Sequence, residues 1–125
     1  MYDSSCLARD IQTLMQIIAR DGYNKSEICY TITNEKNLTQ QDVLHIRLME
    51  LLDENKICDA ENLLFDEIDE DNEAYIELAL DFYQKINVMS EEELNENDFS
   101  RAEILDGIIA VLKKYGVDYT VPPEI

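Results

Sequence analysis

The chain is poor in residues that interrupt helices, with three glycines and two prolines among 125 residues. Both prolines stand near the C-terminal end, at positions 122 and 123. So few turn-forming residues argue against a protein built from many short strands and tight turns. They favour long helices.

Cysteines and long apolar runs are also scarce. The chain has three cysteines, an odd number, and no CxxC pair, which argues against a disulfide framework and a zinc knuckle. We therefore expect Cys6, Cys29 and Cys58 to be reduced core residues. The N-terminus, MYDSSCLARD, is acidic where a secretory signal needs basic residues. No apolar run approaches the roughly 20 residues that span a bilayer. These features predict a soluble, cytoplasmic protein.

Basic residues are outnumbered, since 10 lysines and arginines face 28 aspartates and glutamates, for a net charge of −18. The excess is concentrated in residues 59–98, where 15 acids and the single base Lys85 give a net charge of −14. Such a charge repels phosphate backbones and anionic lipids, so we expect neither nucleic acid nor a membrane as a partner. It attracts basic partners and divalent cations.

The apolar fraction of 46% lies in the globular range, and 125 residues suffice for one modest core. Residues 43–88 form the longest apolar block and show helical periodicity. We therefore predict an all-α fold of five to six helices packed as antiparallel hairpins. We assign residues 1–116 to a single helical domain and residues 117–125 to an extended tail. The domain is expected to contain an N-terminal helix, 1–22, and a repeat-like core, 39–116.

The helix expected between Asn72 and Val88 is apolar on two faces. A polar strip of Glu77, Asp81 and Lys85 runs between these faces. A helix that is apolar on two faces has to be covered on two sides, so we place it in the middle of the helical stack. The two faces consist of Tyr75, Leu78, Ala79, Phe82 and Ile86, and of Ile76, Leu80 and Tyr83.

The N-terminal helix is expected from about Ser4 to Arg20, with Gly22 ending it. Its apolar residues recur at helical spacing and predict a core face. Because this helix stands apart from the central block, we also treat its stripe as a candidate homodimer contact. The stripe contains Leu7, Ile11, Leu14 and Ile18.

Residues 23–38 leave two alternatives open. Asn24 and Glu27 favour a short helix, whereas the β-branched and aromatic run at 30–33 favours an extended segment. In the helical alternative, the residues that face inward are Ile28, Cys29 and Ile32.

Three predicted helix starts carry a capping signature, in which a Ser or Thr side chain accepts a hydrogen bond from the N–H three residues later. The signatures pair Thr39 with Asp42, Ser90 with Glu93, and Ser100 with Glu103.

Gly107, inside the last predicted helix, costs about 1 kcal/mol of helix stability relative to alanine. We expect this glycine to allow close approach of a neighbouring helix.

The sequence repeats itself once, because residues 55–63 match residues 97–105 at a shift of 42 positions. In each copy a helix entry is followed by a small residue, Ala60 or Ala102. This pattern resembles the second helix of a tetratricopeptide-type hairpin, whose usual period is about 34 residues. We assign the difference to an acidic insert around residues 89–96.

Three ordered segments, AENLLFDEID, ELALDFYQKIN and MSEEELNENDFSRAEILDGI, resemble a family of small, acidic, all-helical proteins from Gram-positive bacteria. This resemblance covers roughly residues 40–116. It implies a helical-repeat-like fold and transfers no catalytic residue, because the family has no assigned function.

The residues with chemical potential do not form a known motif. An EF-hand loop starting at Asp69 would need glycine and glutamate where Ala74 and Leu80 stand. His45, the only histidine, stands one helical turn after Asp42, where the two could pair, but a metal site would need more ligands, so we expect a surface or half-buried structural histidine.

Cys58 stands at a predicted helix start, which lowers a thiol pKa, but Asp59 and Glu61 act in the opposite direction. No glycine-rich phosphate loop, GxSxG or HExxH motif is present. We therefore assign no catalytic, cofactor-binding or metal-binding residue.

The leading functional hypothesis is a non-enzymatic interaction or scaffold module, whose acidic face binds a basic or amphipathic segment of a partner protein. The alternatives are a metal-assisted hydrolase that uses clustered acids, and an acidic mimic of nucleic acid. The candidate partner-binding residues are Tyr75, Phe82, Tyr83, Glu77 and Asp81.

Overall fold

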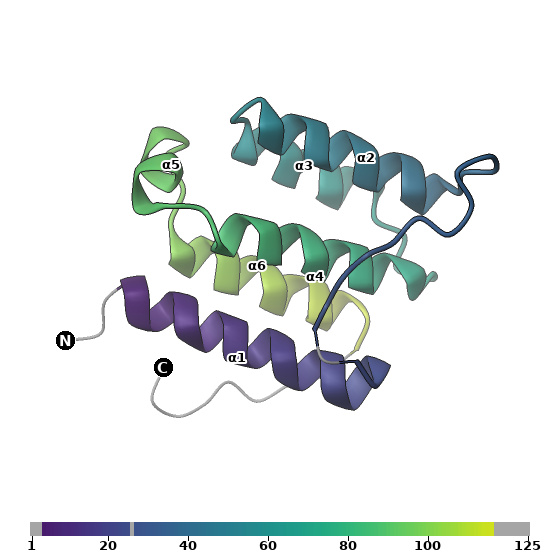
Figure 1. Ribbon diagram of the computed structural model, residues 1–125, viewed down its shortest axis with the longest axis horizontal. Helices are drawn as coiled ribbons and strands as arrows, with labels where there is room; N and C mark the ends of the chain where they lie inside the picture. The colour runs from purple at the N-terminus through teal and green to yellow at the C-terminus, as the bar shows by residue number, and fades with distance from the viewer. Residues whose placement is uncertain (1–3, 26, 117–125) are drawn as a thin grey trace.

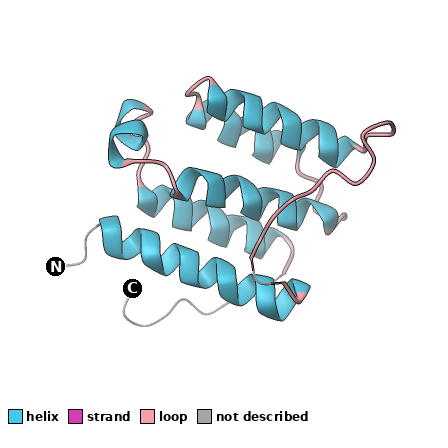
Figure 2. Ribbon diagram, in the orientation of Figure 1, coloured by secondary structure: helices cyan, strands magenta, loops and turns pink. Residues whose placement is uncertain are grey.

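The structure is a computed structural model, and it describes residues 4–25 and 27–116. Within these ranges it contains six α-helices and no strand, which confirms the all-α prediction (Figures 1 and 2). The predicted extended tail, 117–125, lies outside the described residues. The helices are α1 (Ser4–Tyr23), α2 (Gln40–Asp53), α3 (Ile57–Glu67), α4 (Ala74–Asn87), α5 (Glu91–Glu96) and α6 (Arg101–Lys114).

The helices form three tiers, with α2 and α3 in one, α4 and α6 in the next, and α1 in the third (Figure 1). The short turn at residues 54–56 makes α2 and α3 antiparallel neighbours, and α5 leads from α4 into an antiparallel α6. Helix α4 contacts α2, α6 and α1. Tetratricopeptide-type stacking of these pairs stays a prediction.

Helix α4 is the most deeply buried element of the fold, as its two-faced pattern predicted. All eight residues of its two apolar faces are buried in the described structure. Helix α2 covers α4 from one neighbouring tier and α1 from the other, while α6 lies beside α4 in the same tier (Figure 1). The prediction that this helix is shielded on two sides is therefore confirmed.

All three predicted capping boxes are present. Each hydroxyl accepts a hydrogen bond from the N–H three residues later, and the acid at that position accepts one from the capping residue's N–H. Removing such a cap typically costs about 1 kcal/mol. The hydroxyl-to-nitrogen distances are 3.1 Å for Thr39 with Asp42, 3.1 Å for Ser90 with Glu93 and 3.3 Å for Ser100 with Glu103.

The two copies of the internal repeat meet at their first residues. Asn97 Nδ2 donates to Asn55 Oδ1 at 2.6 Å, so the first residues of the two copies touch each other. Asn97 Oδ1 also accepts from the backbone N–H of Ile57, at the start of α3. Asn55 itself has φ 62°, a left-handed conformation that asparagine tolerates better than most residues. The pair fastens the α2–α3 turn to the turn before α6.

A buried arginine holds the end of α4. The guanidinium of Arg101 donates to the carbonyl oxygens of Asn87 at 3.1 Å and Met89 at 2.8 Å. Glu91 lies 3.2 Å from Arg101 Nε and balances its charge. The last carbonyls of a helix lack partners within the helix, so this contact satisfies them from α6.

The segment around α1 corrects the predicted helix end, while homodimerisation through this helix stays a prediction. Gly22 does not end the helix, which continues to Tyr23 and is followed by Asn24 at φ 55°. The expected dimer stripe packs against α4 and α6 of the same chain, so its buried residues are not available to a second copy in this structure. These buried residues include Ile11, Leu14 and Ile18.

The connection from α1 to α2 does not follow the helical alternative for residues 23–38, because its described residues contain no short helix. Only Ile28 of the three expected inward residues is buried, while Ile32 is half-buried and Cys29 is exposed. The expectation of three core cysteines is wrong as well. Cys58 is exposed and Cys6 is only half-buried.

Gly107 of α6 lies directly against Tyr83 of α4, which confirms the predicted close approach. A Cβ atom at position 107 would overlap the hydroxyl and ring of Tyr83. The ring cannot move aside easily, since Tyr83 is fully buried and its hydroxyl donates to Glu61 Oε2 at 2.6 Å. Glycine is required here by the neighbouring side chain.

We predict that Gly107→Ala destabilises the protein by about 1–3 kcal/mol, because the overlap outweighs the helix propensity that alanine adds. Gly22→Ala is the matched control, since Gly22 is helical and exposed. That change should stabilise the protein by about 0.5–1 kcal/mol. Urea unfolding followed by circular dichroism measures both, and equal stabilisation by the two variants would contradict the packing account.

Candidate functional site

The polar strip predicted on α4 is not a solvent-exposed strip. Asp81 is 0% exposed, and its Oδ2 lies 2.7 Å from Nε2 of His45 on α2. Its other oxygen accepts from Lys85 Nζ at 3.0 Å. The sequence had suggested Asp42 as the partner of His45. In the structure His45 pairs with Asp81 instead. A carboxylate removed from water requires such partners.

Asp42 has partners of its own in the same region. Tyr30 donates its hydroxyl hydrogen to Asp42 Oδ1 at 2.5 Å, and Thr39 donates its backbone N–H to Oδ2 at 3.0 Å. The ring of Tyr30 lies 4.7 Å from the ring of His45, centroid to centroid. We call the five side chains that these contacts join the polar cluster. Its members are Tyr30, Asp42, His45, Asp81 and Lys85.

The hydrogen bonds of the polar cluster set its protonation states. Burial acts to raise the pKa of Asp81, but the hydrogen bonds from His45 and Lys85 outweigh it, and the pKa lies below the ordinary aspartate value. The hydrogen bond from Tyr30, followed by that from Thr39, lowers the pKa of Asp42. Burial and the neighbouring Asp42 carboxylate raise the pKa of Tyr30 to about 12.

The arrangement of the polar cluster favours packing over chemistry. Both oxygens of Asp81 are engaged, and a tyrosine hydroxyl with a pKa of about 12 exchanges protons poorly near neutral pH. The cluster instead joins α2, α4 and the segment before α2. Among the described residues, no three His, Cys, Asp or Glu side chains are grouped so that they could hold a metal ion.

Cys58 is the other residue considered for reactivity. Burial of the sulfur and then the carboxylates around it, Glu103 first, raise the pKa of the thiol. Its Sγ lies 3.5 Å from the carbonyl oxygen of Asn97. A thiol with a raised pKa is a weaker nucleophile at neutral pH than an ordinary one.

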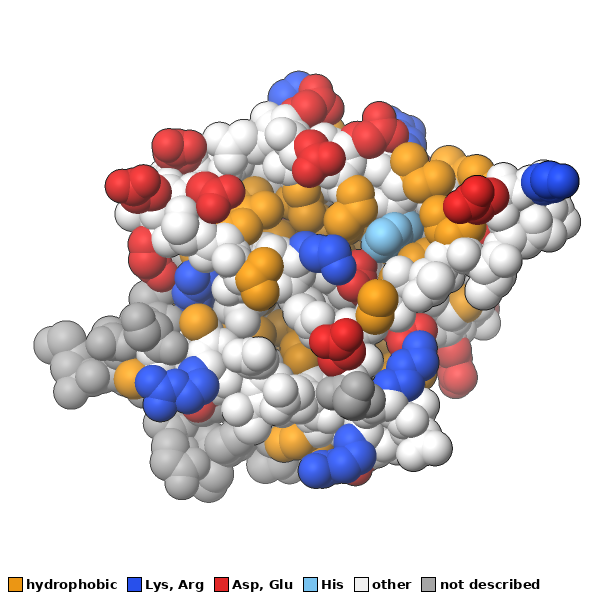
Figure 3. Space-filling view, in the orientation of Figure 1, with side chains coloured by type: hydrophobic (Ala, Val, Ile, Leu, Met, Phe, Trp, Pro, Cys, Tyr) orange, Lys and Arg blue, Asp and Glu red, His pale blue; other side chains and the backbone are white. Residues whose placement is uncertain are grey.

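A groove opens between α2, α3 and the start of α4, with a volume of about 450 Å³. Val43 stands on it and is 46% exposed. Figure 3 shows the face where α2 meets α4, with hydrophobic side chains beside the pale blue histidine and acidic side chains along α2 and α5, while the groove itself is defined by its lining residues. We call this depression the α2–α3 groove. It is lined by Gln40, Val43, Leu44, Arg47, Leu63, Glu67, Asp69 and Tyr75.

The structure places the five predicted partner-binding residues in different environments. Phe82, Tyr83 and Asp81 are fully buried, so their side chains offer no surface to a partner. Glu77 is half-buried and accepts from Lys25 Nζ at 2.8 Å. Only Tyr75 lines the α2–α3 groove.

Sequence reasoning missed Val43 and Leu63 as groove residues. In the structure Val43 lies between Gln40 and Arg47, three residues before and four after, and this mixed row lines the groove. The signal was present, because a valine that shares a helical row with glutamine and arginine belongs to the edge of an apolar face.

A family model described as a family of unknown function (DUF6483) matches residues 1–116. The chain belongs to this family. The predicted resemblance to an uncharacterised family is thus confirmed, while the Gram-positive origin stays a prediction. No curated protein and no solved structure matches the chain. Within the described residues, no helix is both long enough and apolar enough to cross a membrane.

The lowered pKa of Asp81 predicts how stability depends on pH. A carboxyl that ionises more readily in the folded state stabilises the protein above its unfolded pKa of about 3.9, and this contribution is lost as pH falls through the lower folded pKa. We expect Asp81→Asn to lower the free energy of unfolding at pH 7 by about 2–4 kcal/mol.

The difference between wild type and Asp81→Asn should shrink as pH falls below about 4, because the unfolded wild type then binds a proton at Asp81 that the folded state takes up only at lower pH. Denaturant unfolding at a series of pH values measures the free energy of unfolding of both proteins. Subtracting the two values at each pH removes the contribution of the other groups that titrate. Asp106→Asn, on the exposed surface of α6, is the control and should match wild type throughout. A difference that does not vary with pH would contradict the charged pairing of Asp81.

Proposed function

We propose that this protein is a non-enzymatic interaction module that binds a basic, amphipathic segment of another protein in the α2–α3 groove. The observation that carries the proposal is the exposed apolar side chain of Val43 at an apolar floor. Leu44, Leu63 and Tyr75 provide that floor. An amphipathic helix buries its apolar face in such a groove.

The charges of the groove favour a basic segment. Glu67 and Asp69 line it, and the acidic run of residues 66–73 continues from them along the surface. Arg47 is the one base among the lining residues. The surrounding negative charge steers cationic segments toward the groove and discourages acidic ones.

The polar cluster supports a scaffold role and not a catalytic one. Its aspartates, histidine and lysine hold one another between α2 and α4, beside the groove wall that α2 provides. A wall fixed in this way is preorganised, which reduces the ordering that a partner has to impose on binding.

A synthetic peptide tests the proposal. The probe is a fluorescently labelled amphipathic helix with leucines on one face and lysines on the other, and its affinity is read from fluorescence anisotropy. We expect Val43→Ser and Glu67→Lys each to weaken binding roughly threefold to tenfold in 0.15 M salt. High salt should reduce the effect of Glu67→Lys more than that of Val43→Ser.

Asp106→Lys is the matched control, since it makes the same change of charge on the exposed surface of α6, away from the groove. This variant should bind the peptide within about twofold of wild type. A peptide with glutamates in place of lysines should not bind. Equal losses for Glu67→Lys and Asp106→Lys, with no loss for Val43→Ser, would mean that net charge alone attracts the peptide and would contradict the proposed groove.

A further inference from the structure

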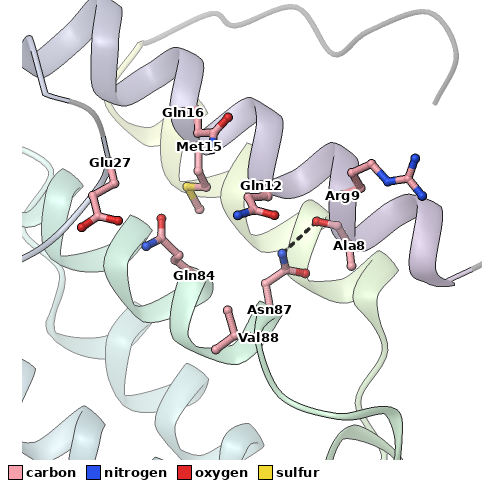
Figure 4. Close-up of a pocket in the computed structure, with 9 residues that line it drawn as sticks. All are labelled: Ala8, Arg9, Gln12, Met15, Gln16, Glu27, Gln84, Asn87 and Val88. Carbon is pink, nitrogen blue, oxygen red and sulfur yellow. Dashed lines mark hydrogen bonds between the residues drawn. The ribbon is translucent and has the colours of Figure 1, made fainter.

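A second groove, about 570 Å³ in volume, lies on the opposite side of α4, between that helix and α1. Its size falls within the range of pockets that hold small molecules or single side chains. Figure 4 shows amide side chains entering it from both helices. We call it the α1–α4 groove. It is lined by Ala8, Arg9, Gln12, Met15, Gln16, Glu27, Gln84, Asn87 and Val88.

Two amides of α4 are held in one orientation by backbone carbonyls. Gln84 Nε2 donates to the carbonyl oxygen of Ile28 at 3.0 Å, and Asn87 Nδ2 donates to that of Ala8 at 3.0 Å. A carbonyl oxygen can only accept a hydrogen bond, so the NH2 end of each amide must face it. The amide oxygen of each side chain therefore remains as a hydrogen-bond acceptor.

The remaining oxygen of Asn87 lacks a partner. Asn87 is 8% exposed, and its Oδ1 accepts no hydrogen bond from any described residue. Buried polar groups are almost always hydrogen-bonded, so an acceptor left free beside a groove indicates a missing donor. Gln12 is exposed and reaches from α1 toward Asn87 (Figure 4).

The other polar groups of the groove add acceptors and negative charge. The carboxylate of Glu27 stands at one end, near the side chain of Gln84 (Figure 4). Arg9 is exposed, and its guanidinium points away from the amides (Figure 4). Apolar surface is present too, from Val88, which is 77% exposed, whereas Met15 is 1% exposed and lies beneath the groove.

We propose that the α1–α4 groove binds a guanidinium group, supplied by an arginine side chain of a partner segment. A guanidinium carries five N–H donors in one plane and no acceptor, which suits a groove that offers the oxygens of Asn87, Gln84 and Glu27. The apolar stem of arginine packs along Val88. An anion finds no matching donors among the α4 amides.

This inference does not rest on the α2–α3 groove, because the two grooves share no lining residue. Binding of the amphipathic peptide and binding of arginine are therefore independent measurements. Val43→Ser should leave arginine binding unchanged, and Glu27→Gln should leave peptide binding unchanged.

Nuclear magnetic resonance titration of the full chain with N-acetyl-arginine methylamide tests the proposal. We expect saturable shifts of the side-chain amides of Asn87 and Gln84, with a dissociation constant on the order of 1 mM. The citrulline analogue has the same shape but no charge, and it should bind about tenfold more weakly. The lysine analogue, a compact cation with three donors, should also bind more weakly than arginine.

Glu27→Gln removes one charge without changing the size of the side chain and should weaken arginine binding roughly threefold to tenfold. Glu35→Gln, an exposed change in the loop before α2, is the matched control and should have no effect. Equal affinity for the arginine and citrulline analogues would overturn the proposal. So would shifts confined to residues outside the α1–α4 groove, or no saturation at concentrations on the order of 20 mM.

Discussion

The pairing of the Asp81 carboxylate with His45 and Lys85 is the interaction on which the arrangement of α2 and α4 depends. Covering α4 on two sides removes Asp81 from water, and an unpaired charge there would cost several kcal/mol. The histidine reaches it from α2, so the charge is satisfied only when the two helices pack in this register. Apolar burial supplies the larger share of stability, while this pair fixes how the helices meet.

The two grooves follow from the same central helix. One lies toward α2 and α3, and the other toward α1, so α4 contributes a wall to each. Both offer apolar surface together with acidic or acceptor groups, in a chain whose net charge is −18. A basic partner that carries an apolar face and an arginine would match both surfaces, as the two proposals require.

The features that could be predicted from sequence are those determined by neighbours along the chain. The capping box of Ser100 needs only the residues of one helical turn, and the burial of α4 follows from its two-faced pattern. The buried pair could not be predicted, because His45 and Asp81 are 36 residues apart and a lone aspartate between apolar faces is typical of an exposed strip. Gly22 failed as a helix stop because glycine tolerates a helix as well as ending one. Tertiary packing decided the pairing of His45 with Asp81.

The central claim is that α4 is the shielded middle of the fold. Native-state hydrogen exchange tests it directly, because amides in the most protected element exchange only when the whole protein unfolds. The amides from Leu78 to Tyr83 should give opening free energies equal to the global free energy of unfolding, whereas those of the six-residue α5 should open far more readily. Exchange of the α4 amides at a free energy well below the global value, or as readily as those of α5, would contradict the account.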